Sequence, residues 1–443
     1  MNRRYSMMSI AAVVAVAGLL FASTYSQTQM TATKLNVPSQ DSDLQKITDM
    51  GGIQLQVPSA FAQIPLDQVD TLASQGRHVV DVKLVAQSVD LPIMGGGKYH
   101  AMTFNGQVPG PTVRATQGDI IRVTLTVPST ESTPHGDDFH ASQMSAGNFG
   151  AVKPGDSRTF AFIAEVPGQF KYHCSGVNVA AMDQHVMSGM YGLTIVDPLN
   201  GYNPLIVDKT DMQNGKVVIV HHRYEADAKE FALEYNQLYL NADGSYDQTA
   251  MFLHNTTQTV VNGFAFGYVP NADINKLIKG DANKNIFVAQ PWNSADLKQY
   301  QSHPLFVDTG VHYRIFVENQ GNMPVFFHIV GEIIDRVVQG NHVQAQGTET
   351  WMVGGSQGAT MDVVFDNPGV YVAVNHDYAA IFSGAATVFV AGDPFNLGYK
   401  AGDMPNPSDA VPPAGMNTIP QKEVVHCLCT DDQAAAIAKS MSG

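Results

Sequence analysis

The stretch Gln169-Phe-Lys-Tyr-His-Cys174 alternates polar and apolar side chains without a break, which is typical of a β-strand. Side chains alternate between the two faces of a strand, so Tyr172 and Cys174 share one face and Lys171 and His173 share the other. The adjacent residues His173 and Cys174 are therefore expected to serve two different sites.

Similar short segments, separated by Gly and Pro, recur before and after this stretch. They fall at residues 79–85, 112–115, 120–127, 158–164 and 193–196, and again at 217–221, 313–319, 360–365, 370–374 and 387–390. The two sets resemble each other: Gly118-Asp-Ile-Ile-Arg-Val is echoed by Gly310-Val-His-Tyr-Arg-Ile. The repeat is too long for a solenoid, so the sequence predicts an all-β chain of two related Greek-key β-sandwiches.

Composition shifts give the expected domain boundaries. Arg3 and Arg4 precede an apolar run, so residues 1–27 are predicted to be a signal peptide or an N-terminal anchor, followed by an extension over 28–75. The sandwiches are expected at 76–200 and 201–392, the second with an insertion near 271–301. Residues 393–443, rich in Pro, Asn and Ser, favour an extended C-terminal arm. The predicted location is outside the cytoplasm: periplasmic, pseudoperiplasmic or extracellular, with membrane anchoring as the alternative.

Charge and cysteine content narrow the possible functions. There are 25 Lys and Arg against 40 Asp and Glu, and the resulting net charge of −15 argues against nucleic acid as a partner. Only three cysteines occur, so a disulfide scaffold is excluded. Two of them lie in the tail motif His426-Cys-Leu-Cys429, for which a metal site, an oxidised pair and a bridge between chains all stay open. Cys174 is left without a partner.

Sulfur and imidazole side chains gather around Cys174 in the sequence. His185 and then Met190 follow it, and His135 precedes it. Two imidazoles, a thiolate and a thioether are the ligands of electron-transfer copper sites, because soft sulfur favours Cu(I) and imidazole suits both oxidation states. A lone Cys or Met is usually a buried apolar residue. The order Cys, His, Met in sandwiches with no other cysteine nevertheless indicates a copper site.

Histidines on the opposite face indicate a second site. His135 and His140 stand five residues apart, which places them on opposite faces, with Asp138 on the side of His140 and His173. His376 lies in the second sandwich at the position that corresponds to the His-Cys pair of the first. Taken alone it is more typical of a hydrogen-bonded histidine, but its place in the repeat favours a ligand. Three histidines without sulfur hold copper or zinc and leave one position open for substrate.

With these residues in view, the chain resembles the copper-containing nitrite reductases, trimeric enzymes with two cupredoxin domains. The matching stretches are residues 135–140 (HGDDFH), 172–174 (YHC), 185–190 (HVMSGM), 327–333 (FHIVGEI) and 374–376 (VNH). The resemblance runs from about residue 79 to residue 392 and implies two tandem cupredoxin-like domains. Eleven positions separate Cys174 from His185, a long spacing that is closest in pattern to the relatives from ammonia-oxidising archaea.

The resemblance implies a role for each matching residue. It places one type 1 copper on His135, Cys174, His185 and Met190, and one type 2 copper on His140, His173 and His376 of each chain. The third type 2 histidine would come from the adjacent subunit, which implies a homotrimer. Asp138 and His328 match the pair that supplies protons, and Val330 matches an aliphatic residue over the type 2 pocket.

The implied activity is the one-electron reduction of nitrite to nitric oxide. An external donor protein, such as a small cupredoxin or a cytochrome, would reduce the type 1 copper, and the electron would pass through Cys174 and His173 to the type 2 copper. A related two-copper oxidase acting on a small nitrogen compound such as hydroxylamine is the alternative. A trinuclear oxidase would need His-x-His pairs and a histidine after the cysteine, where Ser175 stands. An electron carrier would have no use for the open three-histidine site.

Overall fold

The computed structural model describes residues 64–93, 97–144, 151–176, 179–269 and 304–392, which belong to one compact unit. The predicted signal or anchor, most of the extension, the insertion near 271–301 and the C-terminal arm with Cys427 and Cys429 lie outside the described residues. The part of the expected extension that is described contains helix α2, Leu66–Ser74. Among the described residues, no helix has both the length and the apolar content to cross a membrane.

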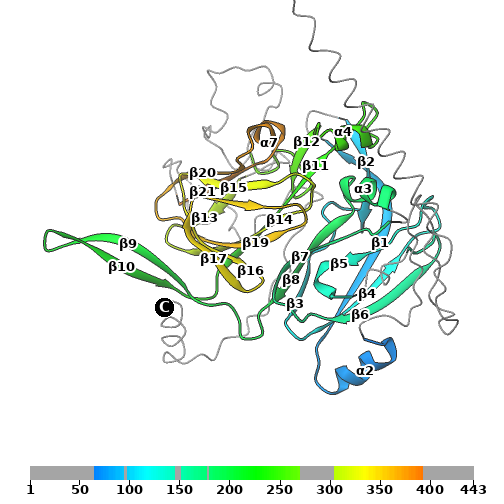
Figure 1. The fold of residues 1–443 in the computed structure, drawn as a ribbon, viewed down its shortest axis with the longest axis horizontal. Helices are drawn as coiled ribbons and strands as arrows, with labels where there is room; N and C mark the ends of the chain where they lie inside the picture. Colours follow the sequence, from blue (N-terminus) through cyan, green and yellow to red (C-terminus); the bar gives the residue numbers. More distant parts are fainter. Residues whose placement is uncertain (1–63, 94–96, 145–150, 177–178, 270–303, 393–443) are drawn as a thin grey trace, which may run out of the picture. The chain divides into compact units, whose positions relative to one another are not determined.

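Two four-stranded sheets form the first sandwich (Figure 1). One has the order β2 (Lys98–Phe104), β1 (Val79–Pro92), β4 (Ile120–Thr126), β6 (Ser157–Ile163), and the other has the order β3 (Val113–Thr116), β8 (Tyr191–Asp197), β7 (Gly168–His173), β5 (Asp138–Phe139). Their inner faces enclose a core of aliphatic and aromatic side chains that includes Leu84, Phe104, Tyr172 and Cys174. The predicted alternation in β7 is thus confirmed, because Tyr172 and Cys174 face this core.

Two larger sheets form the second sandwich. The six-stranded sheet has the order β12 (Gln258–Val261), β11 (Lys229–Leu238), β14 (His312–Asn319), β19 (Gly358–Val364), β16 (Ile334–Gln339), β17 (His342–Thr348). The five-stranded sheet has the order β13 (Leu305–Val307), β21 (Ala386–Ala391), β20 (Gly369–Asn375), β15 (Val325–Val330), β18 (Thr350–Val353). The core between these sheets includes Tyr235, Ile315, Phe327 and Phe389.

The strand pairings show the same plan in both sandwiches. In the first, β4 runs parallel to β1 and antiparallel to β6. In the second, β14 runs parallel to β11 and antiparallel to β19. The other sheet of each sandwich agrees as well. In the first sandwich, β8 pairs antiparallel with β7 and parallel with β3. In the second, β21 pairs antiparallel with β20 and parallel with β13. The duplication predicted from the echo of Gly118 in Gly310 is therefore confirmed.

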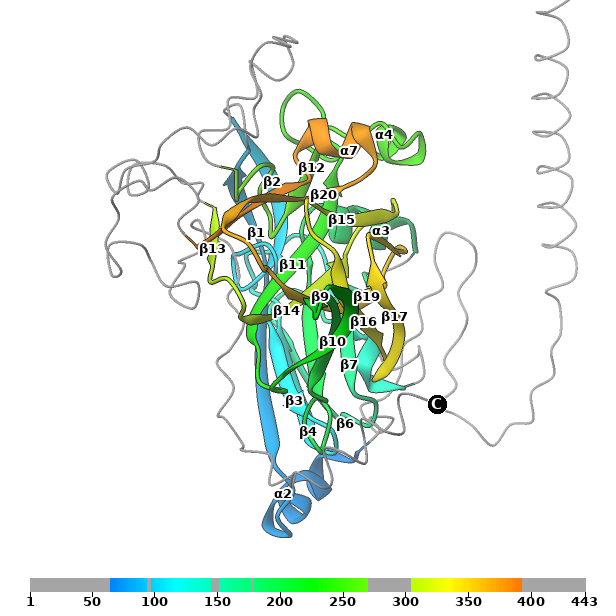
Figure 2. The ribbon, with the colours of Figure 1, turned by 90° about the vertical axis from the view of Figure 1, so that its left-hand side faces the viewer.

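One expected strand belongs elsewhere. Residues 217–221 were predicted to lie in the second sandwich, but they form part of β10 (Lys216–Tyr224), which pairs only with β9 (Leu205–Gln213) among the described strands. Figure 1 shows this hairpin projecting from the sandwiches, and in Figure 2, which is viewed from that side, the hairpin lies in front of them. Alternation marked the strand correctly, but it carries no information about which strand is its partner.

Side chains from β7 join the two sandwiches. Gln169 donates to the backbone oxygen of Val317 on β14 at 2.6 Å, and Lys171 donates to the backbone oxygen of Gln320 at 2.6 Å. Nearby, the buried guanidinium of Arg114 on β3 pairs with Asp197 at 2.9 Å and with Glu230 of β11 at 2.5 Å. The face of β7 that carries His173 is therefore held against the second sandwich.

Candidate metal centres

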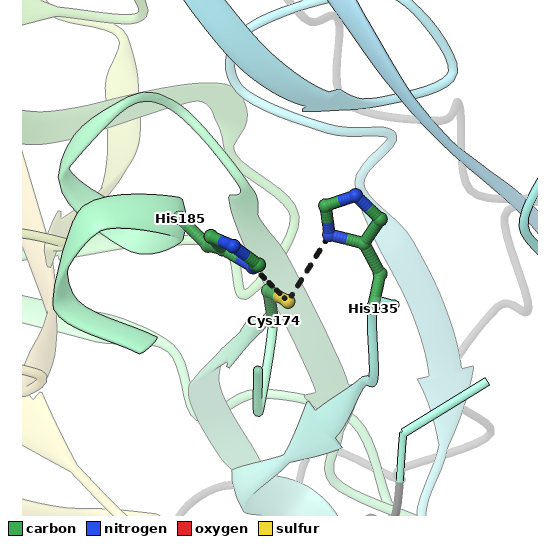
Figure 3. Close-up of side chains that lie close together, drawn as sticks. All are labelled: His135, Cys174 and His185. Carbon is green, nitrogen blue, oxygen red and sulfur yellow. Dashed lines mark hydrogen bonds between the residues drawn. The ribbon is translucent and has the colours of Figure 1, made fainter. Parts of the chain in front are cut away.

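Three side chains of the first sandwich converge on one buried point (Figure 3). The Sγ atom of Cys174 lies 3.2 Å from Nδ1 of His185 and 3.7 Å from Nδ1 of His135. We call these residues the first donor set. All three are buried, and their ligand atoms lie within 4.8 Å of one another. Since metal–imidazole and metal–thiolate bonds are about 2.0–2.3 Å long, the three atoms are close enough to share one metal ion.

Secondary structure around β7 positions these side chains. Cys174 directly follows the last residue of β7, and His185 lies in the last turn of helix α3, Val179–Met187. The segment between Cys174 and His185, interpreted from sequence as a long loop, is thus mostly helical. A backbone hydrogen bond of 3.0 Å from Cys174 to Met190 and another from Met190 to His185 fasten the segment. Met190 is fully buried in the same core as Cys174.

Burial keeps the imidazoles of the first donor set neutral and the thiol protonated. It lowers the pKa of His185 to about 4 and lowers that of His135, although Glu131 acts in the opposite direction. It raises the pKa of Cys174 to about 12, while the backbone amides of Gly136 and Gly176 act in the opposite direction. A bound cation reverses this situation, because it stabilises a thiolate directly. Neutral imidazoles, and a buried cysteine sulfur that accepts a hydrogen bond from a backbone amide, are suitable donors for a copper ion.

The opposite face of β7 carries the second donor set, which consists of Asp138, His140 and His173. The Nε2 atoms of His140 and His173 lie 3.1 Å apart, and Oδ2 of Asp138 lies 3.8 Å from Nε2 of His173. Nδ1 of His173 donates to the backbone oxygen of Cys174 at 2.9 Å, which leaves Nε2 free to bind. Such a bond to the second ring nitrogen typically orients a metal-binding histidine.

Local pairing explains how residues five apart reach different sites. Asp138 and Phe139 form the short strand β5, in which Asp138 pairs with His173 and Phe139 with Tyr172. The chain then enters a 3-10 turn at His140. The alternation argument therefore predicts the correct faces, although only two residues of the segment are in a strand.

Burial brings the carboxyl of the second donor set closer to protonation at neutral pH and keeps its imidazoles neutral. Burial raises the pKa of Asp138 to about 6 and lowers the pKa of His140 to about 4. Burial also lowers the pKa of His173 well below its usual value, and the nearby Lys171 ammonium acts in the same direction. Unprotonated imidazole nitrogens can bind a metal at neutral pH, and a carboxyl with a pKa near 6 can donate a proton there.

The remaining predicted residues lie together on the second sandwich. The rings of His328 on β15 and His376 after β20 are 5.2 Å apart between centroids. Nδ1 of His328 donates to the backbone oxygen of Glu349 at 2.7 Å. Val330 is about half exposed, and His376 is exposed. Within one described chain, His376 does not join the second donor set, because the ligand atoms of Asp138, His140 and His173 form a group without it.

Sequence reasoning missed the groups that surround these sites. Glu131 Oε2 lies 3.9 Å from Nε2 of His135, and the amide of Gly176 donates to Cys174 Sγ at 3.3 Å. Lys171 was assigned only to a face, but it is a buried ammonium next to the second donor set. The one signal in the sequence was a lysine in the alternating stretch, two residues before a candidate ligand.

Two linked β-sandwiches have one Cys-His donor set and one His-His donor set on opposite faces at the end of β7, which is the arrangement of two-domain cupredoxin-like copper proteins. Comparison with known proteins agrees with this class. Residues 86–201 match the family model described as multicopper oxidase, and this range includes both donor sets.

The chain is similar in sequence to the copper-containing nitrite reductase of Rhizobium sullae, with 28% identity over 335 residues that cover 72% of this chain and 78% of the relative. A shorter match, to the copper-containing nitrite reductase of Alcaligenes xylosoxydans xylosoxydans, has 44% identity over 108 residues, or 24% of this chain and 32% of that one. A solved copper nitrite reductase from Nitrosomonas europaea superposes with a TM-score of 0.56 at 29% identity and covers 73% of this chain and 98% of that chain. The resemblance to the copper-containing nitrite reductases is therefore confirmed, and the chain is a relative of these enzymes.

Proposed function

We propose that the protein is a copper-dependent enzyme that reduces nitrite to nitric oxide. The observation that carries this proposal is the pair of donor sets on opposite faces of β7, joined by the peptide link between His173 and Cys174. Relatives named copper-containing nitrite reductase, matched over most of this chain, support the same activity. They do not favour the alternative oxidation of hydroxylamine.

The first donor set, with Met190, is the proposed type 1 site. Copper bound at the two sites would supply a one-electron redox couple and a Lewis acid for nitrite. Cys174 and His173 are consecutive residues, and the His173 ring also donates a hydrogen bond to the Cys174 carbonyl. An electron accepted near the Cys174 sulfur therefore has a short covalent route, with a hydrogen bond beside it, to the second donor set.

The second donor set supplies the groups for substrate protonation. Asp138 reaches into it with a carboxyl whose pKa is raised to about 6, so the residue can carry a proton to a nitrite oxygen. The reaction consumes one electron and two protons for each nitrite and yields nitric oxide and water. We assign to His328 the orientation or reprotonation of Asp138, and to Val330 a place over the substrate.

A homotrimer would complete the site. His140 and His173 belong to the first sandwich, whereas His376, His328 and Val330 occupy an exposed face of the second. Exposed apolar side chains lie on β15, on its partner strand β18 and on helix α7 (Tyr378–Ser383), which follows His376: Phe326, Met352, Tyr378 and Phe382. Burial of such a patch favours association. We propose that the second sandwich of one subunit places His376 against His140 and His173 of its neighbour.

The remaining parts of the proposal concern the cellular setting. We propose export by the N-terminal segment of residues 1–27, and reduction by a donor protein such as a small cupredoxin or a cytochrome. The net charge of −15 would favour a basic docking surface on that donor. The domain limits 76–200 and 201–392 are proposed on the strand plan.

The direct test is anaerobic turnover of the copper-loaded protein with nitrite and a reduced dye, with nitric oxide as the readout. The matched variants are His173→Gln and His221→Gln, because His221 lies exposed on the hairpin, paired with Asp208. We expect nitric oxide from the wild-type protein and from H221Q and none from H173Q. A copper-replete wild-type protein that forms no nitric oxide would overturn the proposed function.

A further inference from the structure

A cluster of charged side chains lies buried between the two sandwiches, behind the second donor set. It consists of Lys171 on β7, Glu234 on β11 and Glu318 on β14, which are 4%, 1% and 0% exposed. Neither glutamate is among the residues assigned above to a metal site or to catalysis. Buried charged groups are rare in proteins unless they are paired, so the cluster requires an explanation.

Neutral amides and hydroxyls hold the charged groups in place. The Lys171 ammonium donates to the backbone oxygen of Gln320 at 2.6 Å and to the Ser356 hydroxyl at 3.3 Å. The Gln320 side chain donates to Oε2 of Glu234 at 2.7 Å and to the backbone oxygen of Gly192 at 3.0 Å.

Glu318 is held on the other side of the cluster. Gln169 donates to Oε2 of Glu318 at 3.3 Å, while Oε1 of Glu318 is buried with no hydrogen-bond partner. A side chain at Gly358 would collide with this carboxyl, because a Cβ there would lie 2.1 Å from Oε2. The carboxyl therefore occupies space that only a glycine at position 358 leaves open.

The formal charges of the cluster do not balance. One ammonium and two carboxylates sum to 1 − 2 = −1, in a place without contact with water. An uncompensated charge in a protein interior costs several kcal/mol, and such groups usually become neutral by taking up a proton. Glu234 and Glu318 are partners in the register of the parallel strands β11 and β14, and two neighbouring buried carboxylates cannot both ionise easily. One additional proton would bring the cluster to zero.

Among the described residues, the groups coupled to the two glutamates supply no positive charge other than Lys171. The titratable groups coupled to the cluster are Asp138 on β5, Tyr172 on β7, Tyr191 on β8 and Tyr268 after β12. Tyrosine is neutral near pH 7, and Asp138 can only add negative charge. Burial raises the pKa of Glu234 and of Glu318, even though Lys171 acts in the opposite direction, and burial lowers the pKa of Lys171 to about 8.

We propose that Glu234 and Glu318 share one proton at neutral pH, and that loss of this proton places an uncompensated negative charge behind the pocket of Asp138, His140 and His173. In this step a carboxyl O–H bond breaks and the proton leaves to solvent. The effect on activity rests on the proposed function, because nitrite is an anion and would be repelled by the added charge. The shared proton itself does not depend on that function.

Infrared difference spectroscopy of the full-length protein tests the shared proton without any substrate. The matched variants are Glu318→Gln and Glu234→Gln, each of which leaves one carboxylate facing Lys171, and the control is Glu225→Gln, which removes an exposed carboxylate. At pH 7 we expect the C=O band of a protonated carboxyl in wild type minus E318Q and in wild type minus E234Q. We expect no such band in wild type minus E225Q. Absence of the band from both of the first two spectra would overturn the proposal.

Stability against pH gives a second test that a local folding defect would not imitate. In the folded protein the pKa of the two glutamates is raised above the value in the unfolded chain. The contribution of the shared proton to the free energy of unfolding is therefore complete below about pH 4.5 and is lost as pH rises towards about 8. Over this window the shared proton makes the unfolding equilibrium constant rise up to about tenfold per pH unit. This contribution should be missing from E318Q and E234Q and present in E225Q. If the unfolding equilibrium constant had the same pH dependence in the wild type, E318Q, E234Q and E225Q, the shared proton would be contradicted.

The KM for nitrite tests the consequence at the pocket. Between pH 7 and pH 9 we expect the wild-type KM to rise about fivefold more than that of E318Q, because the wild type has one more buried carboxyl to ionise. Equal KM profiles together with a positive infrared result would overturn the coupling to the pocket. Absence of nitric oxide from the copper-loaded wild type would remove the proposed function and leave the infrared result unaffected.

Discussion

Replacement of Asp138 by asparagine tests the chemistry proposed for the second donor set. Oδ2 of Asp138 lies 3.8 Å from Nε2 of His173, so the carboxyl faces the point where nitrite would bind. Asparagine keeps the size and shape of the side chain but has no carboxyl proton to donate. General acid catalysis typically contributes a factor of about 100 to 10,000, so we expect nitrite reduction to slow by about 100-fold or more.

The pH profile of this variant gives a sharper criterion than its rate. Burial raises the pKa of Asp138 to about 6. The acid must carry its proton to act, so wild-type activity should fall as pH rises above that value, by up to about tenfold per pH unit. Bound copper would favour the carboxylate and lower the pKa, so the decline should begin at pH 6 or below. In Asp138→Asn this decline of activity with rising pH should be absent.

The assay is anaerobic nitric oxide formation from pH 5 to pH 8, with copper content measured for each sample. The control is Asp90→Asn, which alters an exposed pair with His100 and should leave both the rate and the profile unchanged. If copper-replete D138N kept the wild-type rate, or kept the same decline with pH, Asp138 would not be the acid.

Three further predictions concern the donor sets and the junction between the sandwiches. Cys174→Ser should abolish the thiolate–copper absorption in the visible spectrum and halve the copper per chain, as measured by metal analysis. Arg114→Met should reduce the free energy of unfolding by about 3 kcal/mol, because Asp197 and Glu230 lose their buried cation and keep only Tyr202 and Arg314 nearby, whereas Arg122→Met at a more exposed pair should cost about 0–1 kcal/mol in denaturant titrations. His376→Ala and His140→Ala should each be inactive alone, yet regain activity when co-expressed, because mixed trimers contain intact sites; no recovery in isolated mixed oligomers would contradict the shared site.

Local alternation predicts much of the site. The pattern in residues 169–174 separates His173 from Cys174, and the spacing of His135 and His140 divides them between the same two sites. These inferences succeed because the side-chain period of a strand is two and β5 pairs in register with β7. The duplicated strand plan follows from the same kind of local pattern.

Features that depend on distant pairing could not be read in this way. Residues 217–221 have the alternation of a sandwich strand, but their partner is β9. Residues 177–190 contain no Pro and only one Gly, Gly189. Within this range, Val179–Met187 forms helix α3, where the sequence was interpreted as a loop. The buried cluster combines β7, β11 and β14, whose glutamates lie about 60 to 150 positions from Lys171 along the chain, so no local period reports it.

The most direct measurement of the central claim is the copper content of the purified protein, resolved by site. We predict two copper ions per chain in the wild type, one lost in Cys174→Ser and the other lost in His140→Ala, with distinct electron paramagnetic resonance signals for the two. One copper per chain in the fully loaded wild type, or loss of the same signal in both variants, would contradict the two-site account.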